Sequence, residues 1–252
     1  MHQNPDTVTS AVFLQFAKWP EAGRVKTRLV PALGVAGALQ AHVTLVRAVL
    51  DNLCATGYPV QFWWDREVLD ADPGAELILD DVRAAGIGQW VQQGDTLGER
   101  MTAALGEALA TFERAVVVGS DCPSVDPGYA RDAVSALATH DVVLGPSDDG
   151  GYVLIGARRV VPDMLAGIEW GTPAVLRQTC ERLERLGLRY CLLESRWDVD
   201  EPEDWARFLK MAGETQPAGT NTLLRTNTRG LSPPENGLPE SRCTRNPESG
   251  YT

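Results

Sequence analysis

The chain has 252 residues, 44% of them hydrophobic, and a mean hydropathy of −0.16, which is typical of a globular protein with one sizeable core. Its formal net charge of −11 and pI near 4.8 argue against a general nucleic-acid binder, although a local group of basic residues could still bind a small anion. We find no apolar run of the length that a membrane helix needs and no secretory signal in residues 1–9, so we expect a cytoplasmic protein without a membrane span.

Apolar runs and helical spacing predict strands and helices that alternate along the chain. Strands are predicted at 10–17, 60–64, 90–92, 115–119, 141–145, 152–156 and 189–193. Helices are predicted at 35–54, 73–85, 98–112, 127–138, 172–186 and 202–211. This alternation indicates an α/β fold with helices on both faces of the sheet, and ligands of such folds bind beyond the carboxyl ends of the strands.

The composition predicts one ordered domain with disordered ends. We place the domain at 10–213, after a disordered amino terminus at 1–9. Residues 214–252 are rich in Thr, Asn, Pro, Gly, Ser and Glu and contain few apolar residues, so we predict a disordered tail.

The loop after the first strand is basic. Lys18, Arg24, Lys26 and Arg28 lie within eleven residues of an acidic protein, and Gly23 would let backbone amides face an anion. We predict that these five residues bind the phosphates of a nucleotide. The alternative is a solvated turn paired with neighbouring acids. The Lys-Thr pair is not a P-loop, because a valine rather than a glycine precedes the lysine.

A second polar loop leads into the helix predicted at 98–112. Gly98 would be a tight position at the start of that helix, and Arg100 would be a further contact to the anion. The alternative is an ordinary helix start with a solvent-exposed pair between Glu99 and Arg100.

Three aspartates are the candidate metal ligands. Asp121 follows a buried strand, and Asp198 and Asp200 point the same way if their segment is extended. Such a set could hold Mg²⁺ (or Mn²⁺) against a diphosphate, and Asp121 would act in catalysis through that metal. The alternative for Asp200 is helix capping, with a proline in the first turn and Glu203 at the third position.

The five cysteines do not favour a zinc site, because they are scattered without a Cys-x-x-Cys pair. Cys122 follows Asp121 and could be read as a nucleophile. We interpret it instead as a small buried residue behind the loop.

The segment Asp148-Asp149-Gly-Gly-Tyr is the sharpest local signal. Two adjacent acids repel each other unless a cation or hydrogen-bond donors are present, and the glycines would let a ligand lie against the backbone. Asp149 is the candidate catalytic base. The candidate acceptor-binding residues are Asp148, Gly150, Gly151, Tyr152 and Thr172. The alternative is a pair of ordinary surface turns after buried strands, since Asp and Gly are common turn residues.

Five ordered segments over about residues 10–210 resemble one bacterial family. They are Lys18-x-Pro-x-x-Gly-x-Val-Lys-Thr-Arg-Leu29, Gly98-Glu-Arg-Met101, Gly119-Ser-Asp-Cys-Pro123, Gly145-Pro-x-Asp-Asp-Gly-Gly-Tyr152 and Asp198-Val-Asp-Glu-Pro-Glu-Asp204. The family, DUF2064, comprises uncharacterised glycosyltransferase-like proteins related to 2-phospholactate guanylyltransferase.

The resemblance implies a GT-A-like nucleotide-diphospho-sugar transferase fold, a mixed and mostly parallel sheet with helices on both faces. It also implies that acids matching Asp121, Asp198 and Asp200 bind Mg²⁺, and that the loop matching residues 18–28 handles the nucleotide. The partners would be a nucleotide-activated small-molecule donor and a small acceptor, with no nucleic acid.

Three functions stay open at this point. The chain could transfer a sugar from a nucleoside diphosphate sugar, or a nucleoside monophosphate to an acceptor phosphate with release of pyrophosphate. A nucleotide-binding protein without catalysis is a third class, which the set of three aspartates does not favour. The base, the sugar and the acceptor do not follow from the sequence.

Overall fold

The computed structural model describes residues 10–67 and 73–215. The amino-terminal segment predicted to be disordered, 1–9, lies outside the described residues. So does the predicted tail beyond residue 215.

Seven strands form one sheet in the order β3-β2-β1-β4-β6-β5-β7. The sheet is parallel except for β6, which runs antiparallel to both neighbours, β4 and β5. The strand bounds are β1 Val12–Ala17, β2 Val60–Trp64, β3 Gln89–Val91, β4 Ala115–Gly119, β5 Val142–Pro146, β6 Tyr152–Ala157 and β7 Tyr190–Leu192. The mixed, mostly parallel sheet predicted above is therefore confirmed.

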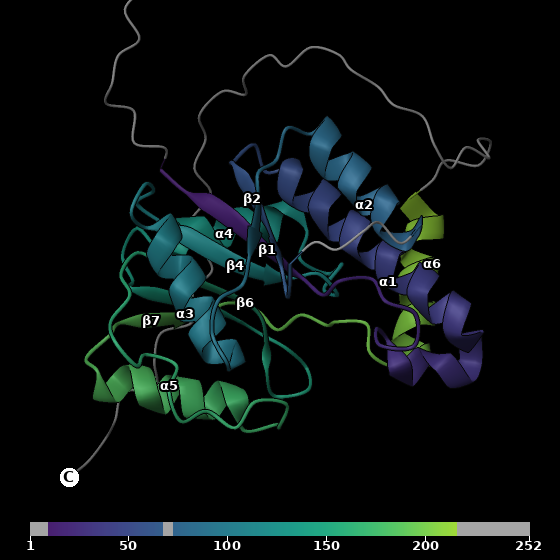
Figure 1. Cartoon of the computed structure of the whole chain (residues 1–252). Coiled ribbons are helices and arrows are strands. Elements are labelled where there is room, and N and C mark those ends of the chain that lie inside the picture. The colour runs from purple at the N-terminus through teal and green to yellow at the C-terminus, as the bar shows by residue number, and fades with distance from the viewer. Residues whose placement is uncertain (1–9, 68–72, 216–252) are drawn as a thin grey trace, which may run out of the picture.

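Helices cover both faces of this sheet (Figure 1). Val12 and Leu14 pack with α3 (Leu97–Ala108) and α5 (Val175–Arg185). Phe13, one residue along, packs with α1 (Val30–Cys54) and α4 (Pro127–Ala136) on the opposite face. Because alternate side chains of a strand point to opposite faces, a strand covered on both sides is apolar throughout, as β1 is.

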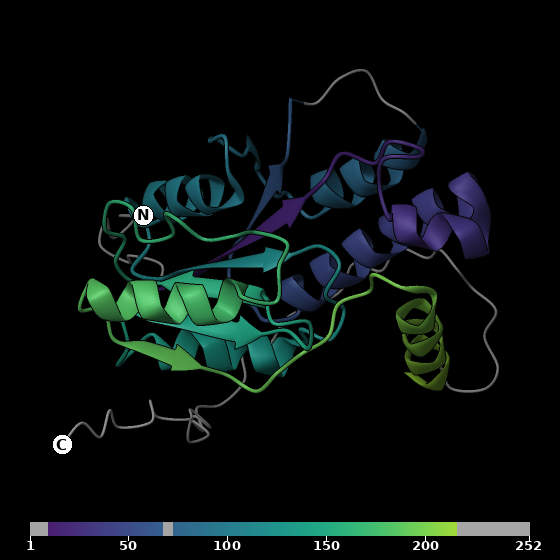
Figure 2. The same cartoon turned by 90° about the horizontal axis from the view of Figure 1, so that it is seen from below.

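The two remaining helices pack against α1. Helix α2 (Pro73–Ala84) shares a buried cluster with α1 and β2. Helix α6 (Pro202–Thr215) lies beside α1 at the edge of the molecule, away from the strands (Figure 2). Its Phe208 packs with Leu45 of α1 and with Val199 in the preceding segment. This packing holds the segment that carries Asp198 and Asp200.

The predicted elements occur, with shifts at their ends. The helix predicted from residue 35 follows a break in α1, because Gly34 has φ 70° and ψ 170°. The helix predicted from residue 172 begins three residues later, at Val175. Helix α6 continues two residues into the predicted tail.

One helical segment, Thr27–Cys54, is long and apolar enough to cross a membrane by length and composition alone, with a mean hydropathy of 1.6 in its best window. The expectation that no segment reaches this threshold was therefore wrong. In the structure 39% of that stretch is buried inside the protein, where residues of α1 pack against the sheet and against α2.

Candidate active site

The basic loop leaves β1 and is fixed by the end of β2. The backbone N–H of Trp19 donates to Asp65 Oδ1 at 2.7 Å, and Arg66 pairs with Glu21 at 3.0 Å. A turn then closes from Glu21 to Arg24, with Gly23 at φ 78°. The loop is thus held in place before it reaches the acids that follow β4.

The structure brings Asp121, Asp198 and Asp200 together. One carboxylate oxygen from each lies within 4.8 Å of the other two, as a shared metal ion requires. The segment that carries Asp198 and Asp200 is held beside Asp121 by a backbone hydrogen bond, in which the Val199 N–H donates to the Asp121 carbonyl at 2.9 Å. Val199 itself is buried, so its two neighbours project to the opposite side, toward Asp121. Three hard oxygen donors in this arrangement suit Mg²⁺ or Mn²⁺.

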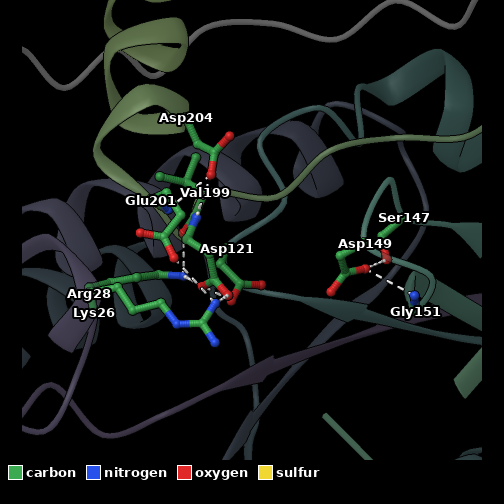
Figure 3. A network of polar contacts seen from close by, with 10 residues as sticks. Lys26, Arg28, Asp121, Ser147, Asp149, Gly151, Val199, Glu201 and Asp204 are labelled. Carbon is green, nitrogen blue, oxygen red and sulfur yellow. Dashed lines mark hydrogen bonds and ion pairs between the residues drawn. The ribbon is translucent and has the colours of Figure 1, made fainter. Parts of the chain in front are cut away.

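Lys26 already contacts two of these acids (Figure 3). Its Nζ donates to Asp121 Oδ2 at 3.0 Å, to Asp200 Oδ1 at 3.2 Å and to the Val199 carbonyl at 2.6 Å. Its side chain is only 7% exposed, and its backbone is left-handed at φ 45°. An ammonium group has three donors, so in this arrangement all three of Lys26 are used within the protein.

The pKa values of the cluster follow from these contacts. Burial opposes the ionisation of Asp121, but Lys26 outweighs it and lowers the pKa of Asp121 to about 2. Burial, together with Asp121, Asp200 and Asp149, raises the pKa of Asp198 to about 7. Burial also opposes the charge on Lys26, but the two carboxylates raise its pKa above the ordinary value. The cluster thus has more negative charge than Lys26 alone neutralises.

A cavity of about 540 Å³, here called the basic cavity, lies on the Lys26 side of the acids. Its charged lining consists of Lys18, Arg24, Lys26, Arg28, Arg100, Asp65, Asp121 and Asp200. The side chain of Arg24 is 64% exposed and pairs only loosely with Glu21, at 3.5 Å. The cavity therefore places cations around a space of nucleotide size.

A second cavity of about 330 Å³, here called the acidic cavity, lies on the other side of the same acids. Its charged lining consists of Arg28, Asp121, Asp149, Asp198 and Asp200. Trp170 and Tyr152 lie in its wall with ring centroids 6.2 Å apart, edge to face, and Thr172 lies beside them. The Tyr152 hydroxyl is buried within the protein, so the ring rather than the hydroxyl is the part available to a ligand.

The two acids of the Asp148–Gly151 turn have hydrogen-bond donors from the turn and from residues beside it. Asp149 Oδ1 accepts from the Ser147 hydroxyl and, at 2.9 Å, from the Gly151 N–H (Figure 3). Asp148 accepts from the Ser195 hydroxyl at 2.7 Å and lines neither cavity. Gly150, at φ 89°, also lines neither; a Cβ there would meet the Pro173 carbonyl at 2.4 Å. The close approach predicted for a ligand at Gly150 is made by the chain itself.

The two other candidate glycines also lie outside the cavity linings. Gly23 shapes the turn described above. Gly98 is packed against the chain, since a Cβ there would meet the Leu165 carbonyl at 2.7 Å. The neighbouring Glu99 forms a capping box with Thr96, and Arg100 Nε donates to the Gly94 carbonyl, so the alternative pair between Glu99 and Arg100 is not formed.

Two alternatives from the sequence are settled by hydrogen bonds and burial. Asp200 does not cap α6; its carboxylate accepts from Lys26 and Arg28, and Asp204 accepts from the backbone at the start of the helix. Cys122 is buried as expected, and burial, with Asp121 beside it, raises the pKa of its thiol well above the ordinary value. Such a thiol is not a nucleophile near neutral pH.

Sequence reasoning missed four polar residues that shape the basic cavity. His42, Asp65 and Gln92 line it, and Gln15 is buried beneath it, donating to Ser120 at 3.1 Å. His42 Nε2 donates to the Lys18 carbonyl at 3.0 Å, and burial lowers its pKa to about 4. Gln15 is the one polar residue of β1, His42 lies in the mostly apolar α1, and Asp65 and Gln92 directly follow β2 and β3. The available signals were therefore a polar residue within an apolar element and polar residues at strand ends.

The chain resembles known proteins in both sequence and fold. The family described as an uncharacterized protein conserved in bacteria (DUF2064) matches residues 59–172. A solved structure from Desulfovibrio desulfuricans G20, of a proposed nucleotide-diphospho-sugar transferase, is 31% identical and has a TM-score of 0.68, covering 76% of this chain and 82% of that one. The chain belongs to the DUF2064 family. No curated protein matches it.

More distant structures share the fold of this family member. A nucleotidyl transferase from Methanothermobacter thermautotrophicus is 13% identical with a TM-score of 0.56, covering 82% of this chain and 99% of that one. The 4-diphosphocytidyl-2C-methyl-D-erythritol synthase from Anaerococcus prevotii is 9% identical with a TM-score of 0.53, covering 81% and 99%. The GT-A-like fold predicted from the sequence is therefore confirmed, and at these identities the likeness extends to the fold alone.

Proposed function

We propose that this protein is a metal-dependent glycosyltransferase that moves a sugar from a nucleoside diphosphate sugar to a small acceptor. One observation carries the proposal: Asp121, Asp198 and Asp200 stand where a cation-lined cavity meets an acidic and aromatic one. A diphosphate fits the first cavity and a small acceptor fits the second, so the transferred sugar would lie between them, at the acids. The Desulfovibrio structure, described as a proposed nucleotide-diphospho-sugar transferase, adds support.

The chain's own residues have separate tasks in this proposal. Lys18, Arg24 and Arg100 line the basic cavity and would hold phosphate oxygens by charge-assisted hydrogen bonds. A divalent ion held by the three aspartates would neutralise the charge on the leaving diphosphate. Lys26 would be free to contact a phosphate once its carboxylate partners bind the ion.

Asp149 is the proposed base. The Ser147 hydroxyl and the Gly151 N–H hold one of its oxygens in the wall of the acidic cavity. The other oxygen could accept the proton of an acceptor hydroxyl as that hydroxyl attacks the anomeric carbon. The turn thus fixes the orientation of the carboxylate before a substrate arrives.

Nucleotidyl transfer is the second candidate, and one feature favours it. The basic cavity has five cationic side chains, more than a diphosphate needs, and a triphosphate would use more of them. In that reaction an acceptor phosphate would attack the α-phosphate and pyrophosphate would leave.

A binding screen followed by product analysis tests both candidates. We expect sugar nucleotides to raise the melting temperature with Mg²⁺ and to have little effect without it. Turnover should then release a nucleoside diphosphate. Release of pyrophosphate from a nucleoside triphosphate would establish the second candidate instead, and no metal-dependent nucleotide binding would contradict both.

A further inference from the structure

The acidic cavity has a lining that selects for the charge of its ligand. Four carboxylates face it, from Asp121, Asp149, Asp198 and Asp200. Among the residues that the structure describes, Arg28 is the one basic side chain in this lining. It already pairs with Asp200 at 3.2 Å and with Glu201 at 3.6 Å. With a divalent ion bound, the four carboxylates would still outweigh the charge of the ion and Arg28 together, so the lining would stay net negative.

A phosphate group in this cavity would therefore lie against like charge. Like charges placed side by side in a binding site repel each other, and this repulsion lowers the affinity for the ligand. The basic cavity, proposed above as the phosphate site, is lined by contrast by five cations, among them Lys18, Arg24 and Arg100. No equivalent group of cations faces the acidic cavity among residues 10–67 and 73–215.

The remaining lining suits a hydroxylated ring. Carboxylate oxygens accept hydrogen bonds from hydroxyl groups, and Asp149 keeps one oxygen free of its own turn. Trp170 and Tyr152 offer apolar ring surface next to these acceptors, and Met101 and Val175 extend it. A volume of about 330 Å³ admits a molecule of one or two small rings.

We propose that the acceptor is an uncharged or cationic polyhydroxy compound bound in the acidic cavity, and not a phosphorylated one. The proposal rests on the function proposed above, because it assigns the second cavity to the acceptor of that reaction. It also separates the two candidate functions, since nucleotidyl transfer to an acceptor phosphate would require that phosphate in this position.

The test uses matched pairs of probes that differ by one phosphate. Glycerol, glucose and myo-inositol are each compared with their own monophosphate by saturation-transfer NMR. The sample is the full chain with Mg²⁺ and a saturating nucleoside diphosphate. We expect at least one neutral probe to bind, and its phosphate to bind about tenfold more weakly or worse. A monophosphate that binds as tightly as its neutral partner would overturn the proposal, and so would no binding by any probe.

Two variants test whether the NMR signal comes from a probe bound in the acidic cavity. Trp170→Ala should weaken the neutral probe severalfold and leave the nucleotide affinity unchanged. Trp90→Ala, which removes a tryptophan outside both cavity linings, should change neither. Nucleotide binding, measured first in the same samples, keeps the outcomes apart: its absence contradicts the proposed function, whereas normal nucleotide binding with tight phosphate binding contradicts only the acceptor proposal.

Discussion

The basic cavity and the acidic cavity share a wall but come from different parts of the chain. The first is built mainly from the loop after β1 and the ends of β2 and β3. The second is built mainly from the turn before β6, from β6 itself and from the loop before α5. The acids between them come from the end of β4 and from the segment before α6. The comparison shows how one sheet edge can offer opposite charge environments a few ångströms apart.

The contrast also separates two kinds of loop. The basic loop is held by side chains of its neighbours, such as Asp65 and His42. The turn that carries Asp149 is held by the Ser147 hydroxyl and the Gly151 N–H, by Ser195 on Asp148, and by the close packing of Gly150 on Pro173. Substitutions of side chains that line a cavity should therefore change ligand affinity, whereas substitutions of residues that hold a loop, such as His42 and Gly150, should change folding stability.

The largest effect is expected at the shared wall. Asp121→Asn removes a carboxylate that faces both cavities, so Mg²⁺-dependent nucleotide binding should be lost by calorimetry. The protein should stay folded, with a lower melting temperature because the buried Lys26 loses a charged partner. Asp148→Asn is the matched control, since it removes a nearby acid that lines neither cavity. If Asp121→Asn kept the nucleotide affinity and metal dependence of the wild type, Asp121 would not be part of the site.

Lys26→Met should have opposite effects on two ligands. Nucleotide binding should weaken by about ten- to a hundredfold, because a contact to a charged phosphate contributes roughly 1.5–3 kcal/mol. Binding of Mg²⁺ alone should tighten, because Lys26 no longer competes for Asp121 and Asp200. Lys18→Met removes a cation of the same cavity that forms no ion pair with these acids, and it should weaken the nucleotide alone. Equal nucleotide affinity in Lys26→Met and wild type would show that Lys26 does not bind the nucleotide and that the loop has only a structural role.

His42 should make stability depend on pH on the basic side. Its pKa is about 4 in the folded protein against 6.5 when exposed, so the unfolded chain binds more protons between these values and stability falls as the pH drops below 6.5. His42→Asn should remove about 2 kcal/mol of the stability difference between pH 7 and pH 5. Urea titrations of both proteins at the two pH values give the comparison. Parallel pH profiles for wild type and variant would show that His42 is not held neutral.

An effect of similar size concerns the wall of the acidic cavity. Gly150→Ala combines a positive φ with a clash against the Pro173 carbonyl, and we expect a loss of about 1–3 kcal/mol in the free energy of unfolding. Gly171→Ala is the control, because it also has a positive φ but meets no atom, and it should cost about 1 kcal/mol. Equal losses in thermal denaturation would mean that the packing on Pro173 does not matter.

Much of the fold followed from the sequence because its signals are local. The strand at 115–119 was predicted with its true ends, since apolar residues run directly into glycine and acid. The antiparallel direction of β6 among parallel neighbours was not predictable from any one segment, because it depends on which strands pair. The late start of α5 was not predicted either; Pro173, just before the helix, packs against Gly150 from a distant part of the chain.

The sequence predicted many residues of the candidate site but few of the contacts between them. Spacing alone suggested that Asp198 and Asp200 point the same way, and the buried Val199 gives the reason. The position of Lys26 between Asp121 and Asp200 could not be predicted, because these acids lie 95 and 174 residues away from Lys26 along the chain. The sequence suggested one group of cations because they lie close together along the chain. In the structure Lys26 instead contacts the acids.

A crystal structure with Mn²⁺ and the tightest-binding nucleotide tests the central claim most directly, that the three aspartates separate a phosphate site from an acceptor site. The anomalous signal of manganese gives the position of the ion independently of the rest of the density. We predict one peak between the carboxylates of Asp121, Asp198 and Asp200, with the diphosphate in the basic cavity against Lys18 and Arg24. Manganese bound elsewhere, or phosphates in the acidic cavity beside Asp149, would contradict the account.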